Sequence, residues 1–339
     1  MTTLTSLHQL RDMLKALPRA DDHARRVAKE RQQILTKPEG SLGRLEEIAL
    51  WLTAWQGVAR PKLDRCQTIV FAGNHGVAAK GVSAFPATVT EQMVANFQSG
   101  GAAINQLCRS VGSDLDVHAL DLDRATADFS EKPAMSPEAC LEAINKGMST
   151  VDPDADIIAL GEMGIGNTTS AAAVCCGLFG GAPSLWVGRG TGVDDATLAL
   201  KAELIRSAIN LYGKQLDDPA TVLCYLGGWE LAAILGATLA ARHHRIPVIL
   251  DGFVCTAAVA PLAALSSGAL DHCIVGHSSV EPGHRHLLEK IGKTAILDLN
   301  MRLGEASGAA LALGIVKSAV AVHNGMATFT EAGVSERQG

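Results

Sequence analysis

A single carboxylate in the last part of the chain is the residue best suited to do chemistry. Glu305 follows Gly304 and precedes a stretch rich in Gly and Ala that predicts a helix. A short apolar segment, Thr294–Leu297, predicts a strand just before it. This order places Glu305 in the first turn of the predicted helix, beyond the end of the strand. Because its small neighbours leave room for a ligand, Glu305 suits a catalytic base better than a surface charge.

A glycine-rich turn at residues 160–173 could bind phosphate. It contains Gly164, and its Asn167 and Thr168 open an Ala-rich segment that predicts a helix. Free N–H groups at the start of such a helix bind anions. The glycines lack the G-x-G-x-x-G spacing of a dinucleotide site. Glu162 in the same turn favours contact with a base or sugar, because a carboxylate is repelled by an anion beside it.

A second glycine-rich turn occupies residues 186–195. Its alternating glycines include Gly188 and Gly190, and they allow the backbone to approach a phosphate closely. Lys201 follows on the next predicted helix and could add a positive charge. A plain turn with capping aspartates would explain the acidic end of this segment but not its three glycines.

Two further strand ends carry polar residues. Asp251 ends a predicted strand and suits ribose hydroxyls, whereas Ser279 follows another strand and can donate to phosphate. His277, His284 and His286 raise the question of a metal ion. The H-E-x-x-H spacing is missing and nearby carboxylates are few, so the sequence predicts no metal site.

The loop after the predicted strand 66–72 combines polar and apolar residues. Asn74 and His75 follow the strand directly. A lone histidine is more often structural than catalytic, although its position at a strand end favours a function. Phe85 and Met93, further along, could form the wall of a pocket for a flat aromatic ligand.

The elements that must position these residues follow an alternating pattern. Short apolar runs separated by helix-length segments predict an α/β fold, doubly wound, with a mainly parallel sheet and helices on both faces. In such a fold ligands bind beyond the carboxyl ends of the strands. Residues 1–60 lie outside this pattern and are predicted to be helical. The candidate strands are Cys66–Ala72, Leu115–Leu120, Asp156–Leu160, Ser184–Val187, Pro247–Leu250, His272–Val275 and Thr294–Leu297.

Composition excludes several classes of function. The chain has 339 residues, and 47% of them are apolar, which is enough for a large core. A net charge of -6 without basic runs argues against nucleic acid as a partner. The amino terminus lacks the apolar core of a signal peptide, and no apolar stretch is long enough for a membrane span. Eight scattered cysteines indicate free thiols, so we expect a cytoplasmic protein.

Taken together, the chain resembles the nicotinate-nucleotide–dimethylbenzimidazole phosphoribosyltransferases of cobalamin biosynthesis. The resemblance rests on several motifs in one order across residues 37–313, namely KPEGSLGRLE, NHGVAAKGVSAFP, GEMGIGNTTSAAA, VGRGTG, LDGF and NMRLGEASGAALAL. It implies a pentosyltransferase without a cofactor. Nicotinate mononucleotide would lose nicotinate as 5,6-dimethylbenzimidazole attacks C1′ of the ribose with inversion, giving α-ribazole 5′-phosphate.

The resemblance also implies an architecture. Members of the family are homodimers with a large doubly wound domain and a small helical domain built from both chain ends. For this chain we therefore expect residues 1–60 together with 305–339 to form the small domain. Residues 61–304 would form the large, Rossmann-like domain.

Carried over by position, the family's general base falls on Glu305. Glu162 matches a carboxylate that lines the base site, and Phe85 and Met93 fall near the benzimidazole. A departure is Asn74, where many members have Asp, which puts any role of a negative charge there in doubt. Positions around the phosphate and ribose match Gly188, Gly190, Lys201, Asp251 and Ser279. The same motifs make substrate-binding candidates of Gly164, Asn167, Thr168, Gly252, Arg302 and Leu303.

Three alternatives stay open at this stage. The chain could be a phosphoribosyltransferase for another aromatic base, since the apolar wall would accept several flat heterocycles. It could be a non-catalytic nucleotide sensor on the same scaffold, although the carboxylates at the strand ends argue against this. A Rossmann-type oxidoreductase is disfavoured by the glycine spacing.

Overall fold

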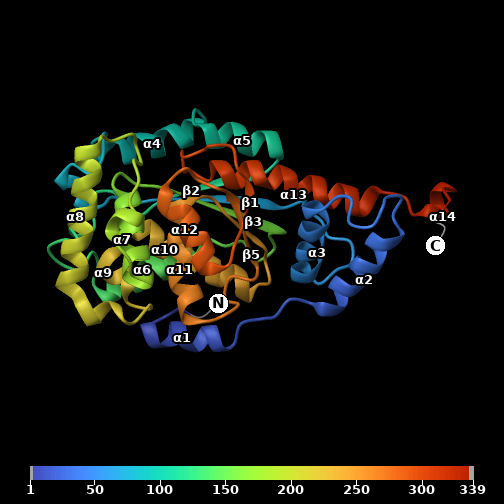
Figure 1. The fold of residues 1–339 in the computed structure, drawn as a ribbon, viewed down its shortest axis with the longest axis horizontal. Helices are drawn as coiled ribbons and strands as arrows, with labels where there is room; N and C mark the ends of the chain where they lie inside the picture. Colours follow the sequence, from blue (N-terminus) through green and yellow to red (C-terminus); the bar gives the residue numbers. More distant parts are fainter. Residues whose placement is uncertain (1–2, 336–339) are drawn as a thin grey trace.

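A single parallel sheet forms the centre of the computed structural model, which describes residues 3–335. The strands lie in the order β2-β1-β3-β4-β5-β6, and every neighbouring pair is parallel. The chain passes from β1 to β2 on one side and then returns to place β3 on the other side of β1 (Figure 1). The carboxyl ends of β1 and β3 therefore flank a topological switch point, where ligands bind in such sheets. The strands are β1 (Cys66–Ala72), β2 (Asp114–Ala119), β3 (Ile157–Met163), β4 (Val248–Leu250), β5 (Cys273–His277) and β6 (Ala295–Leu297).

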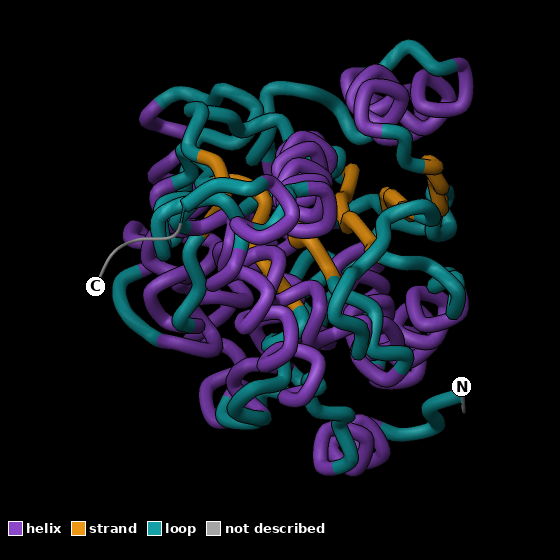
Figure 2. The backbone as a smooth tube through the Cα atoms, turned by 90° about the vertical axis from the view of Figure 1, so that its right-hand side faces the viewer, coloured by secondary structure: helices purple, strands orange, loops and turns teal. Residues whose placement is uncertain are grey.

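Helices cover both faces of the sheet, as expected for parallel strands that are apolar on both sides. Along β3, Ile158 and Leu160 pack in the core cluster of α10 and α11, whereas Ile157 and Ala159 pack in the cluster of α13. Figure 2 shows the strands as a central layer between helices. This alternation follows the two-residue period of a strand. The helices are α1 (Leu7–Lys15), α2 (Asp22–Ile34), α3 (Arg44–Gln56), α4 (Thr88–Ser99), α5 (Ala103–Val111), α6 (Pro137–Ser149), α7 (Asn167–Phe179), α8 (Asp195–Tyr212), α9 (Val222–Leu226), α10 (Trp229–His243), α11 (Phe253–Leu265), α12 (Pro282–Ile291), α13 (Ser307–Gly325) and α14 (Phe329–Ala332).

The predicted α/β class and the parallel sheet are confirmed, and one predicted strand is wrong. The predicted strand Ser184–Val187 is absent, and Pro183–Leu185 forms a 3-10 turn there. Trp186 is completely buried there, and its indole N–H donates to the carbonyl oxygen of Gly180 at 2.9 Å. The apolar run therefore indicated burial of an aromatic side chain and not an extended backbone.

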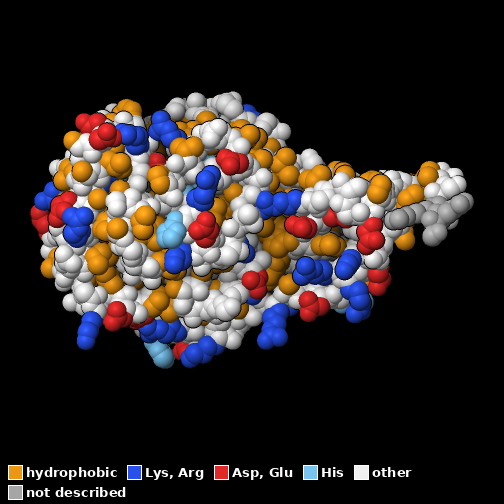
Figure 3. Space-filling view, in the orientation of Figure 1, with side chains coloured by type: hydrophobic (Ala, Val, Ile, Leu, Met, Phe, Trp, Pro, Cys, Tyr) orange, Lys and Arg blue, Asp and Glu red, His pale blue; other side chains and the backbone are white. Residues whose placement is uncertain are grey.

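Segments from both chain ends meet at one end of the molecule. Helices α2 and α3 lie beside the last part of α13 and α14 (Figure 1). Arg31 of α2 donates to the carbonyl oxygens of His323, Asn324 and Met326 at 2.9 to 3.2 Å. Figure 3 shows this end as a narrow extension of a wider body, with acidic and basic side chains interspersed over the visible face.

Helix α1 packs instead on the main body. Its Leu10 and Leu14 belong to the core cluster of α11, and the backbone of Leu4 exchanges two 2.8 Å hydrogen bonds with Asn145 of α6. The first part of α13 covers β3, β4 and β5. The division into residues 1–60 with 305–339 and residues 61–304 stays a prediction.

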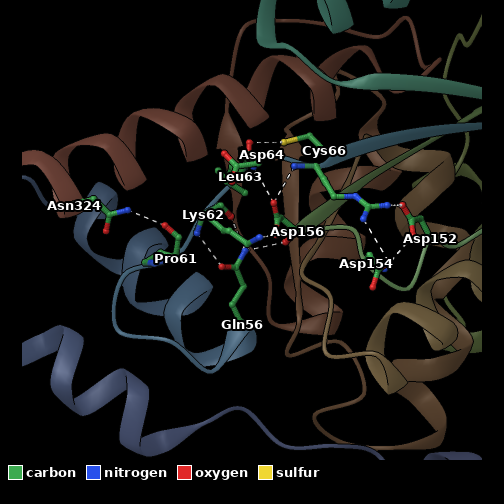
Figure 4. A network of polar contacts seen from close by, with 11 residues as sticks. Gln56, Pro61, Lys62, Leu63, Asp64, Cys66, Asp152, Asp154, Asp156 and Asn324 are labelled. Atoms are coloured by element: carbon green, nitrogen blue, oxygen red, sulfur yellow. Dashed lines mark hydrogen bonds and ion pairs between the residues drawn. The ribbon is translucent and has the colours of Figure 1, made fainter.

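A polar network joins the chain-end helices to the amino ends of β1 and β3 (Figure 4). The Gln56 side chain donates to the carbonyl oxygens of Lys62 and Asp156 at 2.8 and 3.0 Å. Oδ2 of Asp156 accepts the N–H groups of Asp64 and Arg65 at 2.8 and 2.9 Å. These bonds fix the amino ends of the strands, which lie opposite to the predicted ligand site at their carboxyl ends. Within residues 3–335, no helix has the length and apolar character to cross a bilayer.

Candidate active site

A cleft of about 460 Å³ lies at the carboxyl ends of the strands. Its walls come from the loop after β1, the turn after β3, the loop before α8, and the segments that follow β4, β5 and β6. The switch point between β1 and β3 thus lies at the cleft. The sequence-predicted residues that line it are Phe85, Glu162, Gly164, Asn167, Thr168, Gly190, Asp251, Gly252, Ser279, Arg302 and Leu303.

Glu305 lies next to this cleft in an unusual backbone conformation. The helix α13 begins at Ser307, so the prediction of Glu305 in its first turn is wrong. Glu305 and Ala306 both have φ of 62°, a left-handed conformation that is rare and strained in residues other than glycine. The strained turn is held because the N–H of Glu305 donates to the carbonyl oxygen of Glu162 at 3.1 Å. The carboxylate of Asp251 accepts the N–H of Ala309 at 2.9 Å, which fixes the start of α13.

The side chain of Glu305 is only 5% exposed, and its Oε2 has no hydrogen-bond partner. Burial raises the pKa of this carboxyl to about 7, and the negative charge of Asp251 contributes to the rise. Glu305 itself does not line the cleft, whereas its neighbour Gly304 does. A carboxyl with a pKa near neutrality can take up a proton and release it again at physiological pH.

Glu162 lies near the end of β3 and accepts a hydrogen bond from the side-chain amide of Asn167. Burial raises its pKa well above the usual range, and the negative charges of Glu230, Asp251 and Glu305 add to the effect. The protonated form of this carboxyl is therefore favoured relative to that of an exposed glutamate. In that form Glu162 can donate a hydrogen bond to a ligand in the cleft.

Three charged side chains hold the glycine-rich loop before α8. Lys201 donates to the carbonyl oxygen of Gly188 at 3.0 Å, and Arg302 donates to that of Gly190 at 2.7 Å. The carboxylate of Glu281 accepts the N–H of Gly190 at 2.8 Å. A Cβ at Gly188 would overlap this carboxylate. Gly188 and Lys201 do not line the cleft, so they position the loop that does.

Comparison with known proteins identifies the family. The sequence matches the family described as "Phosphoribosyltransferase" over residues 17–334. A relative from Ruegeria pomeroyi, named nicotinate-nucleotide–dimethylbenzimidazole phosphoribosyltransferase, is 57% identical over 336 residues, which cover 99% of both chains. A relative of the same name from Mesorhizobium japonicum is 58% identical over 332 residues, covering 98% of this chain and 99% of the other. The crystal structure of CobT from Thermus thermophilus is similar with a TM-score of 0.86 and 40% identity, covering 93% of this chain and all of the other.

The chain belongs to the nicotinate-nucleotide–dimethylbenzimidazole phosphoribosyltransferase family. The family resemblance inferred from the motifs, and with it the pentosyltransferase class, is confirmed. The structural similarity to CobT also confirms the fold.

Within this phosphoribosyltransferase, the predicted apolar wall is only partly at the cleft. Phe85 lines it and is 52% exposed, and Leu303, which is 55% exposed, lines it as well. Met93 does not line the cleft and packs instead against the cluster of Phe97 and Val70. The cleft therefore has an open apolar rim suited to a flat ring.

Sequence reasoning missed several lining residues, among them Glu281, Thr191 and Phe253. Glu281 is 5% exposed, and burial raises its pKa. A signal was present, because Glu281 follows β5 and precedes Pro282, the first residue of α12. A carboxylate in a turn at a strand end was thus a fair candidate.

Two buried histidines lie at the end of β5 and in α12, namely His277 and His284. His277 is 1% exposed and lines the cleft, with its Nε2 3.8 Å from Oδ1 of Asp251. Nδ1 of His284 accepts the N–H of Ser279 at 3.0 Å, and burial lowers the pKa of His284 to about 3. Among residues 3–335, no group of three or more His, Cys, Asp or Glu is placed to bind a metal ion.

Proposed function

We propose that this enzyme transfers the phosphoribosyl group of nicotinate mononucleotide to 5,6-dimethylbenzimidazole, with Glu305 as the general base. The products are α-ribazole 5′-phosphate and nicotinate. The observation that carries the proposal is a buried carboxyl with a pKa of about 7 beside the cleft at the strand ends. The names of the relatives support the choice of substrates.

The chemistry requires one proton acceptor. The bond between C1′ and the pyridinium nitrogen breaks, and nicotinate leaves with the bonding electron pair, so its nitrogen loses the positive charge. One ring nitrogen of the benzimidazole forms the new bond to C1′ from the opposite face. The N–H proton on its other nitrogen passes to Glu305. No acid is needed at the leaving group, because the pyridinium already carries a positive charge.

Two effects account for most of the rate under this proposal. A base whose pKa lies near the working pH contributes about 10²–10⁴-fold. Holding two substrates in a reactive arrangement contributes more, on the order of 7–11 kcal/mol. Burial of Glu305 serves the first effect, and the shape of the cleft serves the second.

The nucleotide is assigned to the glycine-rich turns. The positive end of the α7 dipole, where Asn167 and Thr168 line the cleft, suits the phosphate, together with the loop at Gly190. Asp251 and Ser279 at the ends of β4 and β5 are assigned to the ribose and phosphate. We assign to Lys201 and Gly188 the role of holding the loop at Gly190 in place. Gly252 lines the cleft and leaves room for the nucleotide. The exposed rings and aliphatic side chains at the rim, Phe85 and Leu303, are assigned to the benzimidazole, with Met93 behind them.

The experiment is to mix the enzyme with nicotinate mononucleotide and dimethylbenzimidazole and to follow both products. We expect stoichiometric nicotinate and an α-configured ribazole phosphate, assigned by NMR of the C1′ proton. Nicotinate released without the benzimidazole would contradict direct transfer to that base, and a β-configured product would contradict the proposed inversion. Binding of the nucleotide without any product would favour a non-catalytic sensor.

A second candidate acceptor is another flat heterocycle. The observation in its favour is the open rim, where Phe85 and Leu303 are each more than half exposed. Comparing kcat/KM for substituted benzimidazoles, purines and phenols decides between them. We expect dimethylbenzimidazole to give the largest value.

The oligomeric state, the cellular location and the cofactor requirement of the enzyme are also part of the proposal. We propose a homodimer in the cytoplasm that needs no cofactor, on the basis of the family resemblance. Sedimentation of the purified protein measures its mass against the 35.4 kDa of one chain.

A further inference from the structure

A buried pair of side chains, His75 and Glu230, lies behind the cleft and has no part in the chemistry described so far. His75 follows β1 and is 2% exposed, and Glu230 in the first turn of α10 is fully buried. Nε2 of His75 and Oε1 of Glu230 form a hydrogen bond. The other polar atoms of the pair, Nδ1 of His75 and Oε2 of Glu230, have no hydrogen-bond partner.

Three glycines from separate segments make room for this pair. A Cβ at Gly73 would lie 2.7 Å from Oε2 of Glu230, and one at Gly164 would lie 2.9 Å from its Oε1. A Cβ at Gly228 would overlap Cε1 of His75. All three positions would have to shift if they carried a side chain. The loop after β1, the turn after β3 and the start of α10 are therefore built around the pair.

Burial of an incompletely satisfied carboxylate is costly, and an apolar pair of the same volume often gives equal or better stability. Stability alone is thus a poor explanation of the His75–Glu230 pair. Its surroundings offer a better one, because the pair lies against the turn that lines the cleft.

The pair faces this turn at two glycines. A Cβ at Gly164 would lie 2.9 Å from Oε1 of Glu230, and a Cβ at Gly166 would lie 3.5 Å from Cβ of His75. The next residue, Asn167, donates through its side chain to Glu162. The backbone of the turn therefore rests between the buried pair on one side and the cleft on the other.

The pair also acts on Glu162 through charge. After burial, the charge of Glu230 is the largest cause of the raised pKa of Glu162. The other titratable groups that face Glu162 are Asp251 after β4 and Glu305 before α13. Of these three carboxylates, only Glu230 does not line or adjoin the cleft.

We propose that His75 and Glu230 are positioning residues of the active site, which hold the Gly164–Asn167 turn in place and present a negative charge to Glu162. The kinetic part of this inference rests on the proposed function, whereas the electrostatic part does not. The two parts are separated by variants that change charge without shape and shape without charge.

Glu230→Gln removes the charge and keeps the size of the side chain and a hydrogen bond to His75. The side-chain amide of Asn167 reports on the protonation of Glu162, because it donates to that carboxyl. In a pH titration of the ¹⁵N-labelled enzyme, we expect the midpoint at this amide to fall by about 1 pH unit or more in the variant. An unchanged midpoint in the folded variant would overturn the electrostatic role. The measurement needs no turnover, so it stands even if the proposed reaction is wrong.

Gly228→Ala displaces the ring of His75 without changing any titratable group. Gly228 has φ of -160°, which alanine adopts freely, so the variant tests the packing and not the backbone. We expect a rise in KM for the nucleotide of about tenfold or more and an unshifted titration midpoint, because misplacing a binding turn by a fraction of an ångström is costly. Unchanged KM and kcat would overturn the positioning role.

His323→Gln is the matched control. His323 is fully buried near the end of α13 and bonds Gln32 and the carbonyl oxygen of Ala59, far from the cleft along its helix. We expect a loss of thermal stability with the titration midpoint and KM unchanged. If this control moved the Asn167 midpoint as Glu230→Gln does, the effect would be general destabilisation, and the inference would fail.

Discussion

Strand β3 has a carboxylate at each end, and the two have opposite surroundings. Before the strand, Asp156 accepts two backbone N–H groups and lies 3.8 Å from the ammonium of Lys62 (Figure 4). Near its end, Glu162 accepts one amide and faces three other carboxyl groups. Asp156 is thus a satisfied structural residue. Glu162 and its neighbour Glu305 are held in surroundings that disfavour their charge.

The difference shows how one residue type serves two purposes in one sheet. Amino ends of parallel strands present free N–H groups, so carboxylates there are stabilised by the backbone. At the carboxyl ends the backbone presents carbonyl oxygens, and buried carboxylates gather without counter-ions. The raised pKa values of these carboxyl groups reflect a loss of folding stability. The same raised values suit the groups to proton transfer.

The largest expected effect concerns Glu305. Glu305→Gln keeps the shape of the side chain but cannot accept a proton, so we expect kcat to fall by about 10²–10⁴-fold. Calorimetry should show nearly unchanged nucleotide binding. Glu289→Gln, at a side chain that is 72% exposed on α12, is the control and should keep full activity. A variant within a few fold of wild type would rule Glu305 out as the base.

Asp251→Asn should have the next largest effect. The amide oxygen can still accept the N–H of Ala309, so the start of α13 is kept while the charge is lost. Because the charge of Asp251 raises the pKa of Glu305, the acid limb of the kcat profile should move to lower pH by about 1 unit. Maximal kcat should fall about tenfold, since the base becomes weaker. A shift to higher pH would contradict the assignment.

The contribution of Glu305 to stability should depend on pH. The pKa of Glu305 is about 7 when folded against 4.5 as its ordinary value. Its contribution to stability is thus full below pH 4.5 and is lost as the pH rises to about 7. Glu305→Gln should therefore unfold with about 1–3 kcal/mol more stability than wild type at about pH 8 and little difference at about pH 4. Denaturant titrations at both pH values measure this, and a less stable variant at the higher pH would contradict the sign.

The smallest effect on activity is expected at the amino end. Asp156→Ala leaves two N–H groups without their acceptor, so we expect a loss of about 1–3 kcal/mol in unfolding free energy. The kcat and KM values should not change, because the network lies at the amino ends of the strands and the cleft lies at their carboxyl ends. A loss of activity in the folded variant would remove the contrast between the two ends.

Local patterns in the sequence predicted most of the fold and much of the site. Strands β1 to β6 were found because apolar runs and turn residues are local signals. The strand at 184–187 was wrong because the buried Trp186 gives the same apolar signal in a 3-10 turn. The left-handed backbone of Glu305 and Ala306 was missed because neither is a glycine.

Long-range contacts account for the rest. Glu281 and Gly190 are hydrogen-bonded although they lie 91 residues apart in the sequence. His75 and Glu230 are hydrogen-bonded across 155 residues. No spacing rule connects such residues. Gly73, Gly164 and Gly228 are visible in the sequence as turn residues, but their shared purpose is apparent only when the buried pair is seen between them.

The pH dependence of kcat, measured with both substrates saturating, tests the central claim most directly. If Glu305 accepts the proton in the ternary complex, kcat should rise about tenfold per pH unit on the acid side and level off near pH 7, following the pKa of its carboxyl. A kcat that is independent of pH between about 5 and 9 would contradict the account.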